Sequence, residues 1–369
     1  MKRSIAAILV STVLVSGFVN AASMDDLRIS GFGSVGVGIA SNDVGYAGYI
    51  DEVDFKQDSL VGLQFDFNIN DKAKVTTQLV ANGRYDFEPA IEVAYLSYDF
   101  DGFTARGGKM RTPFFMYSDY LDVGYAYPML RPSQEIYEHL IVSSYTGVDL
   151  LIPVEIGDTT LQLQPFVGVS QLEERDSSFG TKVDIKDVLG ISAHWYVGDW
   201  IVRYSYAQGK TDDVDFGDLS GYVSNKKADF TSLGMQYNNG RMLFNLEAMQ
   251  TQLEDGYPDV EGVSGILGYQ VGNFMPYFST GWIQTTDDEE RSNLGMLQGY
   301  ERISYSIGNR WDFASNMALK LDVTYVDYQD TIGGFDSNIE YKNIGGNVVP
   351  VGTRHDDTLV YSVSVDFVF

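Results

Sequence analysis

The 369-residue sequence has no cysteine, nine prolines and three histidines. Without cysteine there is no disulfide framework, so an exported chain needs another source of stability, such as a closed ladder of hydrogen bonds. A low proline content leaves long stretches in which strand pairing can continue. After the first 21 residues there is no apolar run near ~18 residues, so we expect no membrane-spanning helix.

Basic residues are also scarce. There are 25 lysines and arginines against 51 aspartates and glutamates, for a formal net charge of −26 at pH 7. We therefore expect no nucleic-acid partner, because its phosphates would be repelled. His194 shares a predicted strand face with Ser192 but with no carboxylate, and His139 and His355 fall in predicted loops. Since no Ser-His-Asp constellation is complete, we expect neither enzymatic activity nor a cofactor.

The chain is rich in aromatic residues and in period-two alternation. It has 25 tyrosines and 21 phenylalanines, which favour strands. In the last stretch, the odd positions from Leu359 to Phe369 are large and apolar, while Ser362, Ser364 and Asp366 lie between them. Such alternation indicates a strand with one apolar and one polar face. Pairing of this strand with the first would close a barrel and leave no edge, which we favour over a sandwich strand.

The start of the chain has the features of a secretory signal peptide. Lys2 and Arg3 precede a mostly apolar run over 5–19 and a small-residue cleavage site. We expect residues 1–21 to be removed, or one residue more, and residues 22–369 to form a single barrel domain. Loss of the two basic residues takes the formal net charge from −26 to −28.

Sixteen segments have strand character, and the connections between them alternate in length. Short turns, such as Asp101-Gly102 and Asn239-Gly240, alternate with longer polar loops. This sorting is typical of a transmembrane antiparallel up-and-down barrel and not of a sandwich. The predicted strands are 27–40, 58–69, 72–83, 90–100, 102–112, 144–156, 158–170, 185–197, 200–210, 229–238, 241–253, 260–271, 274–286, 297–308, 316–330 and 357–369.

Some positions need separate treatment. Pro165 and Pro276 lie inside predicted strands, so we expect a bulge or a strand boundary near each. Gly31 and Gly33, on the outward face of the first strand, suit either contact with a neighbouring subunit or a twist or bulge. Aromatic residues near the short turns predict an interfacial girdle. They are Trp195, Tyr196, Trp200, Tyr237, Phe274, Tyr277, Trp311 and Phe313.

The third long connection, residues 113–143, is rich in Tyr, Phe, Leu and Met, unlike the other loops. An exposed loop of this composition would promote aggregation, so we expect it to fold into the barrel and pack against the wall. Long loops within compact domains usually carry function.

With this loop the sequence resembles a known family, the Gram-negative trimeric porins. The resemblance covers the mature chain and rests on sixteen strands, a fifth strand ending in Gly-Lys-Met-Arg-Thr-Pro, a long third loop and a terminal Phe369. The Pro-Glu-Phe-Gly-Gly loop motif of enteric members is absent. The resemblance implies an outer-membrane homotrimer, in contact with lipid and lipopolysaccharide, whose third loop folds into the lumen. It also implies passive diffusion of small hydrophilic solutes and ions through a water-filled pore.

The family pattern further implies acidic loop residues facing basic wall residues across the narrowest point, where they create a transverse field. A basic side chain facing lipid would cost roughly 2–4 kcal/mol, which favours the lumen. We expect a bulge at Gly107-Gly108 to turn Arg106 inward. The alternative is that the charges only pair with one another. The loop candidates are Asp119, Asp122, Glu135 and Glu138, and the wall candidates are Lys74, Arg106, Lys109, Arg111, Arg203, Arg302 and Lys320.

Other functions stay open at this point. The acidic loops at 211–218 and 287–290 suit a solvated surface better than a Ca²⁺ or Mg²⁺ site bridging to lipopolysaccharide, so we expect no metal. The acidic mouth favours cations, while the basic wall candidates oppose them. A non-conducting structural or adhesive barrel is one alternative. A solute-specific channel is another, with stacking by Tyr117, Tyr120, Tyr125 and Tyr127.

Overall fold

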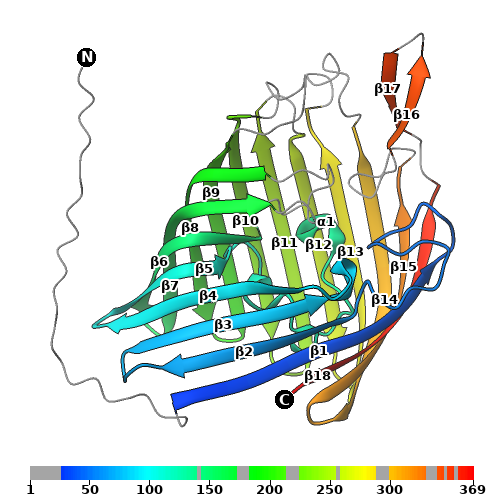
Figure 1. Cartoon of the computed structure of the whole chain (residues 1–369). Helices are drawn as coiled ribbons and strands as arrows, with labels where there is room; N and C mark the ends of the chain where they lie inside the picture. Colours follow the sequence, from blue (N-terminus) through cyan, green and yellow to red (C-terminus); the bar gives the residue numbers. More distant parts are fainter. Residues whose placement is uncertain are drawn as a thin grey trace, which may run out of the picture.

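The computed structural model describes residues 26–138, 143–172, 183–212, 224–254, 258–287, 299–329, 339–344, 347–352 and 356–369. Within these ranges, sixteen strands form one closed barrel in the order β1-β18-β15-β14-β13-β12-β11-β10-β9-β8-β7-β6-β5-β4-β3-β2 (Figure 1). Every strand pairs with its neighbours antiparallel, so the predicted all-β, sixteen-stranded barrel is confirmed. No helix in these ranges is long and apolar enough to cross a membrane.

The barrel strands agree with the sequence prediction in number and order, with small differences at their ends. Residues 331–356 were expected to be a loop, but β16 and β17 form a separate two-stranded sheet there. The strands are β1 (Leu27–Ala40), β2 (Leu60–Asn68), β3 (Ala73–Asn82), β4 (Pro89–Phe100), β5 (Phe103–Arg111), β6 (Ser144–Ile156), β7 (Thr159–Leu172), β8 (Val183–Val197), β9 (Trp200–Thr211), β10 (Lys227–Asn238), β11 (Met242–Leu253), β12 (Val260–Tyr269), β13 (Phe274–Thr285), β14 (Glu301–Ala314), β15 (Met317–Asp327), β16 (Ile339–Ile344), β17 (Asn347–Gly352) and β18 (Thr358–Val368).

The seam between the first and last strands closes the barrel. The β1–β18 register places Gly33 opposite Phe367, and Gly31 exchanges two backbone hydrogen bonds of 2.8 and 2.9 Å with Phe369. A Cβ atom on Gly31 would lie 2.2 Å from the Phe369 ring, and one on Gly33 would lie 2.6 Å from the Phe367 ring. These glycines therefore make room for two rings of the terminal strand, a cross-strand packing that stabilises a glycine position.

Strand alternation gives the wall two chemically different faces. On the outer face, large apolar side chains such as Val35 and Ile307 are exposed, by 62% and 69%. On the inner face, polar side chains such as Ser192, Ser205 and Arg302 are fully buried. Apolar-out and polar-in alternation is what a barrel needs when its outside meets lipid and its inside holds polar groups.

The strand expected to end before Asn309 continues through it. Asn309 pairs with Leu321, and β14 ends only at Ala314, just before a short turn into β15. The turn preference of asparagine is outweighed here by an intact ladder on both sides. Pro276 lies where the β12–β13 ladder ends, as expected. At Pro165 the β6–β7 ladder is interrupted without a change of register, and the β7–β8 register shifts a few residues on, between Gly168 and Ser170, so the expected bulge lies near Pro165 and not at it.

The predicted girdle is divided between the two faces. Trp195, Trp200, Phe274, Trp311 and Phe313 are exposed on apolar strand faces, and Trp200 packs beside Tyr237 with ring centroids 4.8 Å apart. Tyr277 and Tyr196 are the exceptions. Tyr277 is only 4% exposed and its hydroxyl donates to Asp322 at 2.7 Å, and the Tyr196 hydroxyl lies 3.4 Å from Nδ1 of His194 on the inner face. Tyr277 therefore belongs to the interior polar network.

Candidate functional site

Residues 112–138 connect β5 toward β6 and carry three short helices. These are η3 (Ser118–Tyr120), η4 (Gly124–Ala126) and α1 (Gln134–Tyr137). Helix η4 contacts β1 and β18, whereas α1 contacts β11, β12, β13 and β14. In Figure 1, α1 is drawn within the ring of strands. We call residues 112–138 the inner segment, because its contacts described below are with side chains of the inner face.

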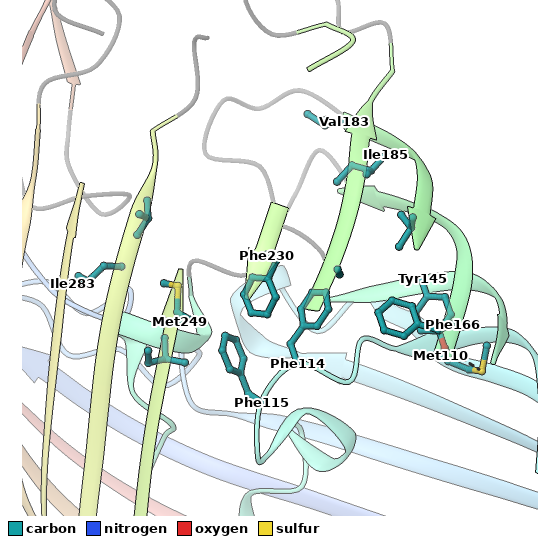
Figure 2. Close-up of a cluster of buried hydrophobic side chains, with 14 of the residues drawn as sticks. Met110, Phe114, Phe115, Tyr145, Phe166, Val183, Ile185, Phe230, Met249 and Ile283 are labelled. Atoms are coloured by element: carbon teal, nitrogen blue, oxygen red, sulfur yellow. Dashed lines mark hydrogen bonds between the residues drawn. The ribbon is translucent and has the colours of Figure 1, made fainter. Parts of the chain in front are cut away.

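The inner segment begins with an aromatic wedge. Phe114 stacks on Phe230 of β10 with ring centroids 4.1 Å apart, and Phe115 meets the same ring edge-on at 5.5 Å. On the other side, Phe114 lies 6.2 Å from Phe166 of β7, which packs beside Tyr145 of β6 (Figure 2). The apolar residues that made this connection unusual in sequence are therefore buried against the wall.

Polar side chains of the wall donate hydrogen bonds to the backbone carbonyls of residues 113–115. Ser205 donates to the Pro113 carbonyl at 2.8 Å, and Ser232 donates to the Phe114 carbonyl at 2.6 Å. The Arg203 guanidinium donates to the Phe115 carbonyl. Three successive carbonyls are thus satisfied by inner-face side chains of β9 and β10, as buried irregular backbone requires.

The far part of the inner segment is held by β14 and β15. The Lys320 ammonium donates to the carbonyls of Gly124 and Met129 at 2.6 and 2.7 Å, and it pairs with Asp366 at 2.8 Å. Arg310 donates to the Tyr125 carbonyl at 2.6 Å. Both basic side chains therefore donate hydrogen bonds to backbone carbonyls of the inner segment.

Glu135, a predicted loop acid, meets Arg302, a predicted wall base. The two side chains are 0% exposed, and Glu135 Oε1 lies 3.1 Å from Arg302 Nε. Ser304 donates to Glu135 at 2.8 Å, and Tyr46 donates at 3.1 Å. Glu138 pairs with Arg302 Nη2 at 3.3 Å. The predicted acid of the loop and base of the wall do meet here, but they form a buried ion pair and do not face water as two separate charges.

A second buried ion pair joins the inner segment to the loop before β2, and it was not predicted from the sequence. Arg131 pairs with Asp58 at 2.6 Å and donates to Ser362 at 2.6 Å, with both charged side chains under 10% exposed. Tyr49 donates to Asp58 at 2.7 Å and is 0% exposed. Two buried tyrosines in a mostly polar first loop, Tyr46 and Tyr49, were the available signal that this loop packs against something.

The opposite wall, from β2 to β6, keeps its charges closer to water. Lys74 lies 3.8 Å from Asp66, and its side chain is 45% exposed. Arg106 Nε donates to Asp149 at 2.8 Å, and the Arg106 side chain is 16% exposed. Here Lys74 and Arg106 each pair with an acid of the same wall, whereas Arg111 at the end of β5 pairs with Asp122 of the inner segment.

The bulge expected at Gly107-Gly108 is absent. The β4–β5 register continues without a shift from Lys109 to Arg106, so these two residues stay on opposite faces. Arg106 needs no bulge, because it already lies opposite the buried Asp149. Lys109 lies on the other face and donates to the Ile91 carbonyl at 2.7 Å.

The two remaining loop acids differ from each other. Asp122 pairs with Arg111, and Glu92 lies 3.5 Å from the same guanidinium. Burial raises the pKa of the Asp122 carboxyl, and the neighbouring Arg111 charge opposes that rise. Asp119 is exposed and makes no ion pair with any described residue. It is therefore the loop candidate whose charge is least compensated.

The histidines and the acidic loops add no further candidate residues to the site among the described residues. His194 Nε2 lies 3.0 Å from Ser192 Oγ, and its other described partner is Tyr196. His139 and His355 lie outside the described residues, as do most residues of the acidic loops. In the part of the chain that the structure describes, no group of three His, Cys, Asp or Glu residues is placed to hold a metal ion.

Comparison with solved structures places the barrel in a known class of fold. No protein-family model matches the sequence, and no curated protein matches it. The trimeric form of OmpT, an outer-membrane protein of Vibrio cholerae, is 13% identical with a TM-score of 0.59, covering 94% of this chain and 100% of that one. The anion-selective porin of Comamonas acidovorans is 14% identical with a TM-score of 0.62, covering 93% and 99%. Salmonella typhi OmpF in complex with daunomycin is 14% identical with a TM-score of 0.59, covering 94% and 100%.

The chain therefore has the sixteen-stranded porin fold of Gram-negative outer membranes over nearly its whole length, as the sequence resemblance implied.

Proposed function

We propose that this protein is an outer-membrane channel for passive diffusion of small hydrophilic solutes and ions. The observation that carries the proposal is the closed barrel with apolar residues outside and a polar, charged inner face. Apolar outer walls suit lipid, and polar inner walls suit water-filled passage. The porin fold adds support at the level of fold.

The inner segment is the proposed constriction. Its side-chain and backbone contacts run from β7 and β10 at Phe114 to β15 at Gly124 and β14 at Glu135. A segment tied to strands so far apart around the ring leaves less of the cross-section open. The remaining passage is expected beside β2 to β6, where Lys74 and Arg106 keep exposed surface.

We further propose that the channel prefers cations. The basic side chains Arg302 and Lys320 are fully buried and paired with acids, so they add little positive potential to the lumen. The exposed Asp119 has no ion-pair partner among the described residues. In a narrow passage with low-dielectric walls, an unpaired carboxylate attracts cations and repels anions.

The decisive test is conductance across planar lipid bilayers. Purified full-length protein is expected to give stepwise, ohmic openings whose reversal potential in a salt gradient favours cations. A folded protein that gives no conductance would contradict the proposal and favour a structural or adhesive barrel.

A trimer embedded in lipid and lipopolysaccharide is the assembly we propose, by analogy with the trimeric form of OmpT. Openings in groups of three, together with a trimer mass by native light scattering, are the expected results. Single-step openings from a monomer would contradict this assembly without contradicting the channel itself.

The solute-specific alternative loses part of its basis. Tyr117 and Tyr127 are 3% and 6% exposed, so their rings are packed and do not offer stacking surfaces. Tyr125 lies under the Arg310 guanidinium, 4.5 Å from its ring centroid. Saturable block of conductance by a sugar would favour the alternative, and we expect none.

A further inference from the structure

The first loop, residues 41–59, packs against the inner face of the barrel (blue, beside β15 in Figure 1). Val326 lies in the inward-facing row of β15 that carries Lys320, and Val360 lies in the corresponding row of β18. Both valines are 0% exposed and belong to one buried cluster with the loop. An apolar patch on the inner face would otherwise meet water, so the loop occupies lumen beside β15 and β18. The loop side chains of this cluster are Val44, Tyr46, Ala47 and Tyr49.

Two glycines of the first strand provide room for the loop. A Cβ atom on Gly38 would lie 2.7 Å from the Tyr49 ring, and one on Gly36 would lie 2.7 Å from the Asp58 Cβ atom. Packed side chains do not approach so closely, so a larger residue at either position would displace the loop. The loop itself turns at Gly45, whose φ of 73° favours glycine. The inner face of β1 is therefore shaped for a loop that lies inside the barrel.

Tyr46 contacts both members of one buried ion pair of the inner segment. Its hydroxyl donates to Glu135 Oε1 at 3.1 Å, and the guanidinium carbon of Arg302 lies 5.1 Å from its ring centroid. One side chain thus makes a hydrogen bond to the acid and a cation–π contact to the base.

Tyr49 repeats this arrangement on the second buried ion pair. Its hydroxyl donates to Asp58 Oδ2 at 2.7 Å, and the guanidinium carbon of Arg131 lies 5.4 Å from its ring centroid. In each pair one partner belongs to the inner segment, Glu135 in the first and Arg131 in the second. Two tyrosines of one loop therefore attach that loop to the inner segment at two points.

We propose that residues 44–50 of the first loop are a second constriction element, which Tyr46 and Tyr49 hold against the inner segment. The inference rests on the proposed channel function and adds to it a second determinant of solute size. The inner segment narrows the lumen beside β7, β10, β14 and β15, and the first loop fills the part beside β15, β18 and β1. The passage then runs beside β2 to β6, and its width depends on both elements.

The first test measures whether the loop is held in place, by thiol labelling of the full-length folded protein. Because the chain contains no cysteine, Val360→Cys places a single thiol beneath the loop, where a charged methanethiosulfonate reagent should react slowly. Adding Tyr46→Phe and Tyr49→Phe together should raise the labelling rate at least about ten-fold, since each change removes a hydrogen bond to a buried carboxylate. Gly38→Ala, which displaces the Tyr49 ring without altering either tyrosine, should raise the rate as well.

Two controls define the range of labelling rates. Gly268→Ala also adds a Cβ atom to an inner-face strand glycine, but its nearest contact, with Met275, would be an ordinary 3.5 Å, so the Val360→Cys rate should not change. Lys74→Cys places the thiol on the open side, where Lys74 is 45% exposed, and should label rapidly in every background. Rapid labelling of Val360→Cys alone would show that the loop does not cover the wall. Equally slow labelling with all the loop substitutions, beside rapid labelling of Lys74→Cys, would overturn the role of the tyrosines.

The second test measures the solute size limit, from the swelling of protein-containing liposomes in neutral sugars of increasing length. The protein with Tyr46→Phe and Tyr49→Phe should admit sugars that wild type excludes, and Gly268→Ala should not. Faster labelling with an unchanged size limit would overturn the constriction role and leave the loop a structural cover. Wild type that admits neither ions nor sugars would refute the channel proposal itself, and with it the constriction role, while the labelling rates would still show whether the tyrosines hold the loop.

Discussion

The two arcs of the inner wall treat basic residues differently. On the arc from β9 to β15, Lys320 and Arg302 are fully buried, and each meets an acid together with groups of the inner segment. On the arc from β2 to β6, Lys74 and Arg106 pair with acids of their own wall and keep 45% and 16% exposure. The first arc therefore uses its positive charge to anchor the inner segment, whereas on the second arc only Arg111 does so, through Asp122, and Lys74 stays near water.

This difference shows why the sign of a side chain's charge and its position on a strand do not by themselves determine its role inside a barrel. A buried ion pair is strongly destabilised when one partner is removed, because the other charge stays buried and unpaired. An exposed pair contributes little, because water and salt screen it. Substitutions on the two arcs should therefore differ in kind, and the following predictions test that difference.

The largest effect is expected for Lys320→Met. It leaves Asp366 buried without a partner and removes the donor from the Gly124 and Met129 carbonyls. We expect a loss of about 3–5 kcal/mol in the free energy of unfolding, measured by urea titration in lipid. Adding Asp366→Leu should restore much of the loss. The same stability for Lys320→Met and wild type would refute an anchoring role.

Tyr46→Phe should have the next largest effect. The hydroxyl donates to the buried Glu135 carboxylate at 3.1 Å, and a hydrogen bond to a buried charge contributes about 1.5–3 kcal/mol. Protease cleavage of the inner segment should become faster in this variant. Tyr206→Phe is the control, since that hydroxyl also donates to a carboxylate, Asp229 at 2.7 Å, but on the outer face of the wall. Equal cleavage rates in the two variants would contradict a stabilising role for the hydrogen bond from Tyr46 to Glu135.

Asp119→Asn should change selectivity rather than stability. A unit charge acts on an ion 4 Å away with about 1 kcal/mol in water, roughly a five-fold local enrichment. The ratio of cation to anion permeability, from reversal potentials in a salt gradient, should fall accordingly. Asp122→Asn should change it less, because Asp122 is already paired with Arg111. The reverse order would show that the wrong acid has been assigned to the passage.

The smallest effect is expected for Lys74→Gln on the open arc. Its pair with Asp66 is 3.8 Å long and half exposed, so its loss should change the free energy of unfolding by about 0–1 kcal/mol. Any effect should vanish near 1 M salt, where the Debye length is about 3 Å. A salt-resistant loss as large as that of Lys320→Met would remove the distinction between the arcs.

Much of the architecture follows from local patterns that a sequence displays directly. Alternation from Leu359 to Phe369 specifies a two-faced strand, and short Gly, Asn and Asp turns specify hairpins. Both signals depend on neighbours a few residues apart. Where they failed, as at Asn309, a continuous ladder outweighed the preference of one residue.

The candidate site was less accessible to such reasoning. Alternation indicated that Arg302 and Lys320 point inward, and the family resemblance implied that acids of the third connection face them. Alternation did not indicate that Glu135 and Arg302 bury each other, or that Arg131 meets Asp58 across 73 positions. It also misjudged the path near Arg106, because a bulge cannot be inferred from glycine alone.

The sequence by itself determined the alternating faces, the number of barrel strands and the apolar character of the inner segment. Only the tertiary structure decided which charges neutralise each other and which remain beside the passage. The physical reason is range: alternation is a property of adjacent residues, whereas ion pairing and burial depend on groups that only the closed barrel brings within a few ångströms.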